Sequence, residues 1–573
     1  MLPWARFAAA VAFGLVTALA AASQQPSPSP TVPPEPKPEE EGFPITSTAV
    51  KEGCGLCHKS DEKGRMTRIS YRRTTPEGWQ QTIRRMAALN GASLEPEKAR
   101  EILRYLADTL GLAPEEARPA AFEAERRMID YKYADKETEQ VCSKCHSMGR
   151  VIGERRTKEE WELLLAMHRG FYPLSDFQAF RRLEPRRTTP GPDGRPPDNR
   201  HPMEKALAHL VPAFLLRTPE WAAWSANLRP PRLEGRFSLV GYQPGKGPVY
   251  GEVKIAAKGG APGEFTTEMR YAPARGGATI SGQGQAIVYT GFQWRGRSTA
   301  GAETLREVML VERDWKQISG RWFTGAYDET GMDVRLSRIG NDPVVLGVSP
   351  IALRAGASAQ TVRIHGANLP ASLEPADFDF GRGVRVTRVV AAAPESASVE
   401  VDVAKDADVG TRDVFVAGAS RAEAAVAYQT VDALKVTPQA GMARIGGANF
   451  PKGFQQFEAV ALSNGADGKP GTKDDLNLGV ADVQWTIEEW NALCADDDKD
   501  FVGRIDQAGL FTPAEDGPNP KRSGNRNNVG DVWVVATLNA DSPLKPGKTL
   551  RGRAHLIVTV PLYMRWDTTG VAQ

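Results

Sequence analysis

The pattern of apolar positions divides the chain into a helical part and a longer β part. In residues 95–110 and 201–216, apolar side chains recur every three or four positions, the spacing of one helix face. Beyond residue 229, short stretches such as 251–255 and 268–271 alternate apolar and polar residues, and Gly-rich turns separate them. Alternation with period two between regular turns predicts antiparallel strands.

Breaks in the β pattern predict three β domains, so the expected fold class is multidomain, α followed by all-β. The helical residues 45–228 come first. Residues 229–342 are expected to form an antiparallel, β-barrel-like domain. Residues 343–430 consist of short alternating strands, which are typical of an immunoglobulin-like sandwich. Residues 431–573 are expected to form a second immunoglobulin-like β domain.

The first residues have the pattern of an export signal. Arg6 supplies a positive start, the apolar stretch 7–22 follows, and small residues near its end offer cleavage sites. We therefore expect residues 1–23 to be a cleaved signal peptide and the protein to be periplasmic, with an uncleaved anchor as the alternative. Residues 24–44 are expected to form a disordered, Pro-rich tether. No second long apolar run follows, so no membrane span is expected in the mature chain.

Composition and charge exclude few classes of function. The 573 residues are 41% hydrophobic and 25% charged, and the formal net charge is +2. This balance is ordinary for globular domains, and it gives no electrostatic sign of nucleic-acid binding. We expect no nucleic-acid partner.

Four of the five cysteines form two tight pairs, and a histidine follows each pair directly. The two motifs are Cys54-Gly55-Leu56-Cys57-His58 and Cys142-Ser143-Lys144-Cys145-His146. Two thiols at this spacing can form thioethers to one porphyrin, while the adjacent histidine binds the iron. A zinc site or a thioredoxin-like dithiol would leave both histidines unexplained. The motifs therefore predict two covalent haem c groups, four thioether cysteines and His58 and His146 as axial iron ligands.

The helical residues contain a weak internal repeat, with halves at about 45–115 and 116–228. Each half has a helix that opens on a threonine, a plausible N-cap, and carries a tryptophan in its first turn. Aligning Trp79 with Trp161 places Met86 opposite His168. Each lies seven residues beyond its tryptophan, about two helical turns, so it shares a face with that tryptophan.

This alignment proposes Met86 as the sixth iron ligand of the first haem and His168 as that of the second. Met66 is the rival of Met86. The rivals of His168 are Met167, Met203, His201 and His209. Thioether ligation would raise the potential of the first haem relative to the second haem, which would have two histidine ligands.

The β part offers no catalytic motif of a familiar kind. It contains no Ser-His-Asp order, phosphate loop or zinc-protease helix, and five of the seven histidines lie in the helical part. The acidic stretches 467–475 and 496–498 contain clustered carboxylates that would suit calcium, but their spacing departs from an EF-hand loop and favours solvated turns. Cys494 is expected to be a structural thiol. We expect the β domains to serve as scaffold or docking surface.

The chain resembles the alpha subunit of quinohaemoprotein amine dehydrogenase over nearly everything after the tether. The resemblance is carried by the two haem motifs and by stretches near the end: 500–506 (DFVGRID), 509–513 (GLFTP), 516–520 (DGPNP) and 527–536 (NNVGDVWVVA). It implies a periplasmic heterotrimer that oxidises primary amines. A propeller-type beta subunit and a small gamma subunit bearing a cysteine tryptophylquinone would complete it.

In that family the haems of this subunit carry electrons from the quinone to a soluble cytochrome or cupredoxin. The resemblance therefore implies an oxidoreductase subunit with no catalytic residue on this chain. Two other functions compete with it. A dihaem cytochrome c peroxidase-like enzyme would need one iron with an open coordination site, and a stand-alone dihaem electron carrier would use the β domains for docking.

Overall fold

The computed structural model describes most of the chain after the first 40 residues. The described residues are 41–121, 133–144, 146–181, 185, 186, 188–192, 194–260, 262–324, 330–448, 450–491 and 496–561. The expected signal peptide, nearly all of the tether, and Cys145 and Cys494 lie outside this set. Residues 42–573 form one compact unit, and the description below is confined to that unit.

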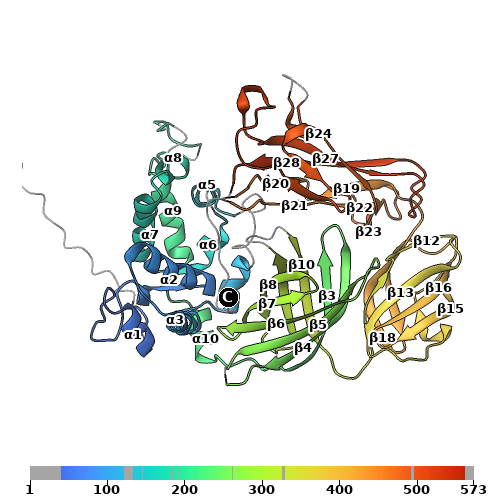
Figure 1. Ribbon diagram of the computed structural model, residues 1–573, viewed down its shortest axis with the longest axis horizontal. Coiled ribbons are helices and arrows are strands. Elements are labelled where there is room, and N and C mark those ends of the chain that lie inside the picture. The colour runs from blue at the N-terminus through green and yellow to red at the C-terminus, as the bar shows by residue number, and fades with distance from the viewer. Residues whose placement is uncertain are drawn as a thin grey trace, which may run out of the picture. The chain divides into compact units, whose positions relative to one another are not determined.

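Helices dominate the chain up to residue 226, in blue and cyan in Figure 1. They are α1 (Thr48–Cys54), α2 (Pro76–Asn90), α3 (Pro96–Thr109), α4 (Pro114–Ala117), α5 (Lys136–Cys142), α6 (Gly149–Ile152), α7 (Lys158–Phe171), α8 (Ser175–Gln178), α9 (Pro202–Ala213) and α10 (Pro219–Ala226). A side-chain oxygen accepts a backbone N–H at the start of five of these helices, which satisfies a donor that has no partner within the helix. The five capping residues are Ser47, Thr75, Asp135, Thr157 and Thr218.

The two helices predicted from apolar spacing are present. Helix α3 covers the range predicted as 95–110 and buries Ile102, Leu103 and Leu106 on one face. Helix α9 covers most of the range predicted as 201–216, but it ends at Ala213. The prediction overestimated this helix because Leu215 and Leu216 continue the apolar pattern after the helical backbone has ended.

Eight antiparallel strands close into a barrel after the helical region, in green in Figure 1. They are β3 (Gly235–Gln243), β4 (Gly247–Ala257), β5 (Glu264–Pro273), β6 (Ile280–Tyr289), β7 (Gln293–Ala300), β8 (Glu303–Val311), β9 (Gln317–Thr324) and β10 (Thr330–Arg338). Consecutive strands pair, and β10 returns to pair with β3. Alternate residues point inward and fill the interior, as in other barrels of this size. Trp294, Trp322 and Phe237 are among these buried residues. The barrel-like prediction is confirmed.

The next unit consists of two four-stranded sheets around one apolar core. Its strands are β11 (Val344–Ser349), β12 (Ala352–Arg354), β13 (Gln360–Ala367), β14 (Phe378–Asp379), β15 (Val384–Ala393), β16 (Ser396–Val403), β17 (Gly410–Val416) and β18 (Ala419–Tyr428). One sheet has the order β11-β13-β16-β15 and the other has the order β12-β18-β17-β14. Val362, Ile364 and Val399 are fully buried between them.

The last unit has three small sheets and a core of its own. Its strands are β19 (Ala433–Thr437), β20 (Ala440–Arg444), β21 (Gln455–Gln456), β22 (Glu458–Ser463), β23 (Leu476–Val480), β24 (Gln484–Glu489), β25 (Gly503–Ile505), β26 (Leu510–Pro513), β27 (Gly530–Leu538) and β28 (Leu550–Thr559). The single-turn helix α11 (Asp498–Phe501) lies before β25. The central strands β27 and β28 pair over nine residues.

Side chains tie the helical region to the barrel. Tyr289 of β6 belongs to the apolar core formed by α1, α2 and α3. Beside it, the backbone N–H of Thr290 donates to Asp108 of α3 at 2.6 Å, and the Trp224 indole of α10 donates to the Thr290 carbonyl at 3.0 Å. The helical region is therefore held against one end of the barrel by both apolar and polar contacts.

Within the described residues, no helix has both the length and the apolar character needed to cross a bilayer.

Candidate haem-binding site

The first motif lies at the end of α1. The carbonyl of Cys54 accepts hydrogen bonds from the N–H groups of Cys57 and His58, at 3.2 and 3.0 Å. This turn keeps both thiols close in the chain, and neither is in a disulfide. Gly55 follows the helix where space is short, because a Cβ there would lie 2.2 Å from the Lys51 carbonyl oxygen. The motif therefore presents two thiols and an imidazole from a single turn.

The imidazole of His58 is oriented by a loop that follows the motif. Its Nδ1 donates to the carbonyl of Thr67 at 2.9 Å, and a bridge between Ser60 and Met66 closes the loop. Fixing the proton on Nδ1 leaves the lone pair on Nε2, which is the usual arrangement of a metal-binding histidine. His58 is thus prepared to bind a metal through Nε2.

The second motif begins at the last residue of α5, and Asp135 caps the start of that helix. Cys142 is the last residue of that helix, and Cys145 lies outside the described residues. Burial raises the pKa of Cys142 to about 12, and it also raises the pKa of Cys54. Both side chains are therefore neutral thiols at neutral pH, and these react slowly with oxidants and disulfides.

The rings of His146 and His168 lie close together, at a spacing that suits two ligands of one metal ion. Their ring centroids are 6.4 Å apart. Metal–imidazole bonds are about 2 Å long, and a ring centroid lies roughly 1 Å behind its ligating nitrogen, so two histidines on one metal place their centroids about 6 Å apart. The Nδ1 of His146 donates to Ser147 at 2.9 Å and that of His168 donates to Leu164 at 2.8 Å, both to backbone carbonyls. Both Nε2 atoms therefore remain available.

The surroundings of these two rings favour neutral imidazole. Burial, followed by the charge of Arg150, lowers the pKa of His146 to about 4. Burial also lowers the pKa of His168. Metal ligation requires the neutral form, so the protein does not have to remove a proton at neutral pH before these residues bind iron.

The candidates for the sixth position of the first haem differ in burial. Met86 is half-buried on α2, and its Sδ accepts a contact from the Asn90 amide at 3.8 Å. Met66 is fully buried among the apolar side chains of the first core. Met66 is therefore engaged in core packing, whereas Met86 lies nearer the surface.

The rivals of His168 have other contacts. His201 caps α9, where its Nδ1 accepts the N–H of Met203 at 3.3 Å. His209 is 2.8 Å from the Tyr133 hydroxyl through Nε2. Met203 packs against the small core that includes Leu165 and Phe180. Among the described residues, His168 is the one of these three histidines whose ring lies beside the His146 ring.

Several large apolar side chains of the helical region are exposed, and one of them lies inside the first motif. Leu56, inside the first motif, is 85% exposed. Phe177, close after His168 in the chain, is 71% exposed. The other exposed apolar side chains of the two halves, among the described residues, are Leu89, Phe171, Tyr172, Leu174, Leu215 and Leu228. The exposed Leu56 inside the first motif suits contact with a large apolar ring. The residues present fit a haem in each half.

A short strand pair joins the two halves about a local two-fold axis. Strand β1 (Arg72–Thr74) runs antiparallel to β2 (Glu154–Arg156), and Arg73 pairs with Arg155. The offset of 82 residues that relates Trp79 to Trp161 also relates Arg73 to Arg155. The central pair therefore lies on the axis, and α2 and α7, which follow the two strands, are related by the same axis.

Buried ion pairs hold this junction. Glu116 accepts hydrogen bonds from Arg73 at 2.7 and 2.8 Å and from Arg155 at 3.2 Å. Burial tends to raise the pKa of Glu116, but the hydrogen bonds and charges of the two guanidinium groups outweigh it and hold the pKa at about 2. One carboxylate thus bridges an arginine from each half.

Four family models match the chain. They are described as quinohemoprotein amine dehydrogenase, alpha subunit, in its haem-binding part (residues 45–185), domain II (230–339), domain III (342–429) and domain IV (434–571). Together they cover the helical region up to residue 185 and every β unit.

The chain belongs to the quinohemoprotein amine dehydrogenase alpha-subunit family. The resemblance inferred from the motifs is therefore confirmed, and so is a haem-binding domain. Members of this family form one subunit of a multi-subunit oxidoreductase.

Other comparisons add no argument. No curated protein matches the chain. Among solved structures, a redesigned β-barrel shares 15% identity at a TM-score of 0.17 and covers 19% of this chain and 92% of its own. Human protocadherin-24 EC1-2 shares 12% identity at a TM-score of 0.15 and covers 38% of this chain and 96% of its own. Neither score is high enough to support a common overall fold.

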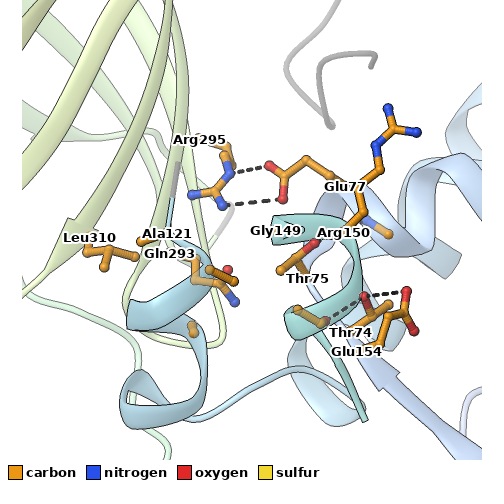
Figure 2. Close-up of a pocket in the computed structure, with 14 residues that line it drawn as sticks. Thr74, Thr75, Glu77, Ala121, Gly149, Arg150, Glu154, Gln293, Arg295 and Leu310 are labelled. Carbon is orange, nitrogen blue, oxygen red and sulfur yellow. Dashed lines mark hydrogen bonds and ion pairs between the residues drawn. The ribbon is translucent and has the colours of Figure 1, made fainter. Parts of the chain in front are cut away.

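A small cavity lies where the haem-binding part of the chain meets domain II (Figure 2). Its volume is about 30 Å³, enough for one or two water molecules and too small for a substrate. Glu77 of α2 and Arg295 of β7 form an ion pair at its edge, as Figure 2 shows. Burial favours a higher pKa for Glu77, but the Arg295 charge lowers the pKa overall, so the pair is ionic. The cavity is part of the contact between the two domains.

Arginines offset most of the charge of the acidic cluster of domain IV. Asp496, Asp497 and Asp498 place carboxylate oxygens within 4.8 Å of one another. Arg522 donates to both Asp497 and Asp498, and Arg526 also pairs with Asp497. Two guanidinium groups thus occupy the positions a cation would take. The loop 467–475 is exposed and hydrogen-bonds to itself through Asp474.

Sequence reasoning missed the arginines of β1 and β2. Three-residue strands are too short for an alternation signal, and buried arginines do not stand out from exposed ones in a sequence. Their one visible sign is the symmetry of Arg72-Arg73-Thr74 and Glu154-Arg155-Arg156 about the internal repeat.

Proposed function

We propose that this chain is the dihaem electron-transfer subunit of a periplasmic quinohemoprotein amine dehydrogenase. It would take electrons from a cysteine tryptophylquinone on a small partner subunit during oxidative deamination of primary amines, and pass them to a soluble cytochrome or cupredoxin. The family assignment supports the amine dehydrogenase, and the two repeated motifs support two haems.

In this proposal each half holds one haem c through a matched set of residues. Cys54 and Cys57 form the thioethers of the first haem, and Cys142 and Cys145 form those of the second. His58 and His146 bind the irons from one side. Met86 and His168 are the proposed sixth ligands. Each set combines a motif at the end of a helix with one residue from a later helix, which is α2 after β1 in the first half and α7 after β2 in the second.

The observation that carries the proposal is the closely spaced pair His146 and His168. Both rings are oriented by hydrogen bonds to backbone carbonyls, and their spacing matches two ligands on one iron. An iron held from both sides has no free position for peroxide. The pair therefore supports electron transfer over the peroxidase alternative.

Bound haem supplies one-electron oxidation and reduction. The chain's own residues set where this happens and at what potential. A methionine ligand favours the reduced iron more than a second histidine does, so the two halves are expected to differ in potential. The β1–β2 pair fixes the halves side by side, which suits transfer between them.

The β region is proposed to be scaffold and docking surface. We propose that the two units after the barrel are immunoglobulin-like sandwiches. The partners would be a propeller-type beta subunit and the quinone-bearing gamma subunit. Catalysis of amine oxidation would occur on the gamma subunit, and export would follow from the signal peptide at residues 1–23.

Purification from the native host tests this function directly. The proposal expects two smaller subunits to copurify and primary amine to reduce the haems of the complex, but not those of the isolated chain. If the chain purifies without partner subunits and amine reduces the haems in no fraction, the result would favour the stand-alone carrier.

A further inference from the structure

A groove lies at one end of the barrel, between the segment that leads into β3 and the turn from β4 to β5. Its volume is about 830 Å³, which is within the range of binding clefts in proteins. Residues 229–234 line one side and residues 257–265 line the other. Arg104 of α3 donates to the carbonyl of Pro262 at 3.1 Å, so this is the end of the barrel next to the helical region.

Hydrogen bonds hold both sides of the groove in place. Arg338, the last residue of β10, donates to the carbonyl of Arg232 at 2.8 Å and to that of Glu234 at 2.7 Å. On the other side, the N–H of Lys258 donates to the carbonyl of Glu264 at 2.9 Å, and the two side chains form an ion pair at 3.5 Å. The groove is therefore a preformed part of the fold, and a partner would not have to order it on binding.

Trp315, in the turn between β8 and β9, gives the groove an aromatic side chain at a strained position. Its φ of 59° lies in the left-handed region, which bulky residues rarely adopt. The indole packs partly buried against the barrel core, and the buried Pro231 and Phe265 also line the groove. Backbone strain of this kind is concentrated at functional sites, so it points to a use for this indole.

The basic side chains around the groove outnumber the acidic ones. Arg229 and Arg232 are exposed, and their guanidinium groups make no ion pair or hydrogen bond within the described residues. Arg338 donates to backbone carbonyls and has no carboxylate partner in the described part of the chain. Among the described residues that line the groove, Glu234 is the one acidic side chain without a partner. Three unpaired cations are therefore left with one unpaired carboxylate.

The sequence of the first side sets the spacing of two of these charges. Pro230 and Pro231 fix their own φ angles, and a residue before a proline avoids the helical region, so the backbone from Arg229 to Arg232 is extended. No helix or strand includes these residues. Three residues of such backbone span about 9 Å. Two carboxylates of a second extended chain, two or three residues apart, would have a similar spacing.

We propose that this groove binds an extended, acidic segment of another subunit, with carboxylates at Arg229 and Arg232 and an apolar side chain against Trp315. Arginine and tryptophan are the side chains that contribute most to binding at protein interfaces, and complementary charge selects the partner. The volume and the separation of the charges exceed what one small anion would fill. Members of this family work in a multi-subunit enzyme, so such a partner is present. The inference depends on that membership and on no property of the haem sites.

Lysine variants allow a carbodiimide to join the groove to the carboxylates that it binds. Arg229→Lys with Arg232→Lys keeps both charges and adds two amines. The complex is purified from the native host through the full chain, treated with carbodiimide and digested, and the cross-linked peptides are identified by mass spectrometry. The expected result is a bond from a new lysine to an aspartate or glutamate of another subunit. Cross-links confined to Glu234, or to a second copy of this chain, would overturn the inference.

Arg382→Lys with Arg385→Lys is the matched control. These two arginines are also exposed and three residues apart, but they pair with Asp408 at 3.9 Å and with Asp402 at 3.4 Å. The control is expected to form cross-links within the chain and none to another subunit.

Charge reversal measures what the groove contributes to assembly. Arg229→Glu with Arg232→Glu should weaken binding of the other subunits by about tenfold or more and reduce its dependence on salt, because two attractive charges become repulsive. Arg382→Glu with Arg385→Glu should change neither, and thermal unfolding checks that both variants are folded. Unchanged affinity would overturn the inference even if amine still reduces the haems. Absence of haem reduction by amine with the cross-links present would instead refute the proposed function alone, and a chain that purifies without other subunits would overturn both.

Discussion

The two halves of the helical region share a scaffold but surround their motifs differently. Each has a helix ending at a cysteine, a short strand and a threonine-capped helix. In the first half, six additional residues separate the motif from its strand, and they include the buried Met66. His58 is held by this loop through Thr67, whereas His146 is held by the next residue.

Under the proposed function, this difference would let one repeat produce two redox sites. The repeat would fix the positions of the proposed ligands, and the residue type at a single position, Met86 or His168, would change the chemistry. The surroundings differ as well, because the Nε1 of Trp161 in the second half has no hydrogen-bond partner among the described residues. The first half satisfies the equivalent indole with the Leu110 carbonyl.

Removal of the thioethers should produce the largest effect. Cys54→Ser with Cys57→Ser should leave one covalent haem, and so should Cys142→Ser with Cys145→Ser. The second pair should also lower thermal stability more, because Cys142 packs against two apolar cores and Cys54 against one. Intact mass and thermal unfolding check both points. Two haems in either double variant would contradict the assignment of the motifs.

Removal of the distal histidine should affect only the second half. His168→Ala should leave the haem attached but open its iron to small ligands, because the opposing imidazole is lost. Visible spectra with added cyanide or imidazole measure this. The matched control is His209→Ala, and the iron of this variant should bind neither cyanide nor imidazole. If both variants keep the wild-type spectrum, the repeat alignment is wrong.

The two methionines of the first half should separate ligation from packing. Met86→Ala should lower the first haem's potential or open its iron, with little loss of stability. Met66→Ala should cost about 2–5 kcal/mol of unfolding free energy and leave the potential unchanged, because it creates a core cavity. Denaturant unfolding and redox titration together distinguish them. A changed potential in Met66→Ala alone would exchange the two roles.

The junction between the halves should weaken in acid. The folded pKa of Glu116, about 2, is below its unfolded value, so its stabilisation is complete above about pH 4.5 and is lost as pH falls toward 2. A shift of this size is worth roughly 3 kcal/mol. Glu116→Gln should remove most of this pH dependence in denaturant titrations. The control is Glu115→Gln, which removes only an exposed surface pair with Arg313. This variant should retain the pH dependence of stability.

The threonine caps should give the smallest effects, and these should be similar in the two halves. Thr75→Ala and Thr157→Ala each remove an oxygen that accepts a helix N–H, so each should cost about 1 kcal/mol. Chemical unfolding measures this cost. The neighbouring exposed Lys158→Ala serves as control and should change stability little. A much larger cost at one threonine would show that the two helices are not equivalent.

Local signals account for what the sequence predicted correctly. The haem motifs are defined by adjacent residues, and the caps at Thr75 and Thr157 and the apolar stripe of α3 are local patterns. The alternation after residue 229 predicted strands, and the barrel was expected in outline. These features depend on residues within a turn or two of one another.

The remaining features depend on contacts between residues far apart in the chain. Closure of the barrel needs β10 to pair with β3, nearly a hundred residues earlier. The ion pair of Glu77 with Arg295 and the bridge of Glu116 to Arg155 are of the same kind. In the sequence these side chains look like solvated charges, because nothing nearby shows that they are buried.

The most direct test of the account is a count of haems in the mature protein. Intact mass spectrometry with a visible spectrum gives both the number of covalent porphyrins and their ligation. The account predicts two porphyrins per chain, each attached through a cysteine pair, and six-coordinate iron in the second half. A chain with no porphyrin, or with one attached at either motif alone, would contradict it.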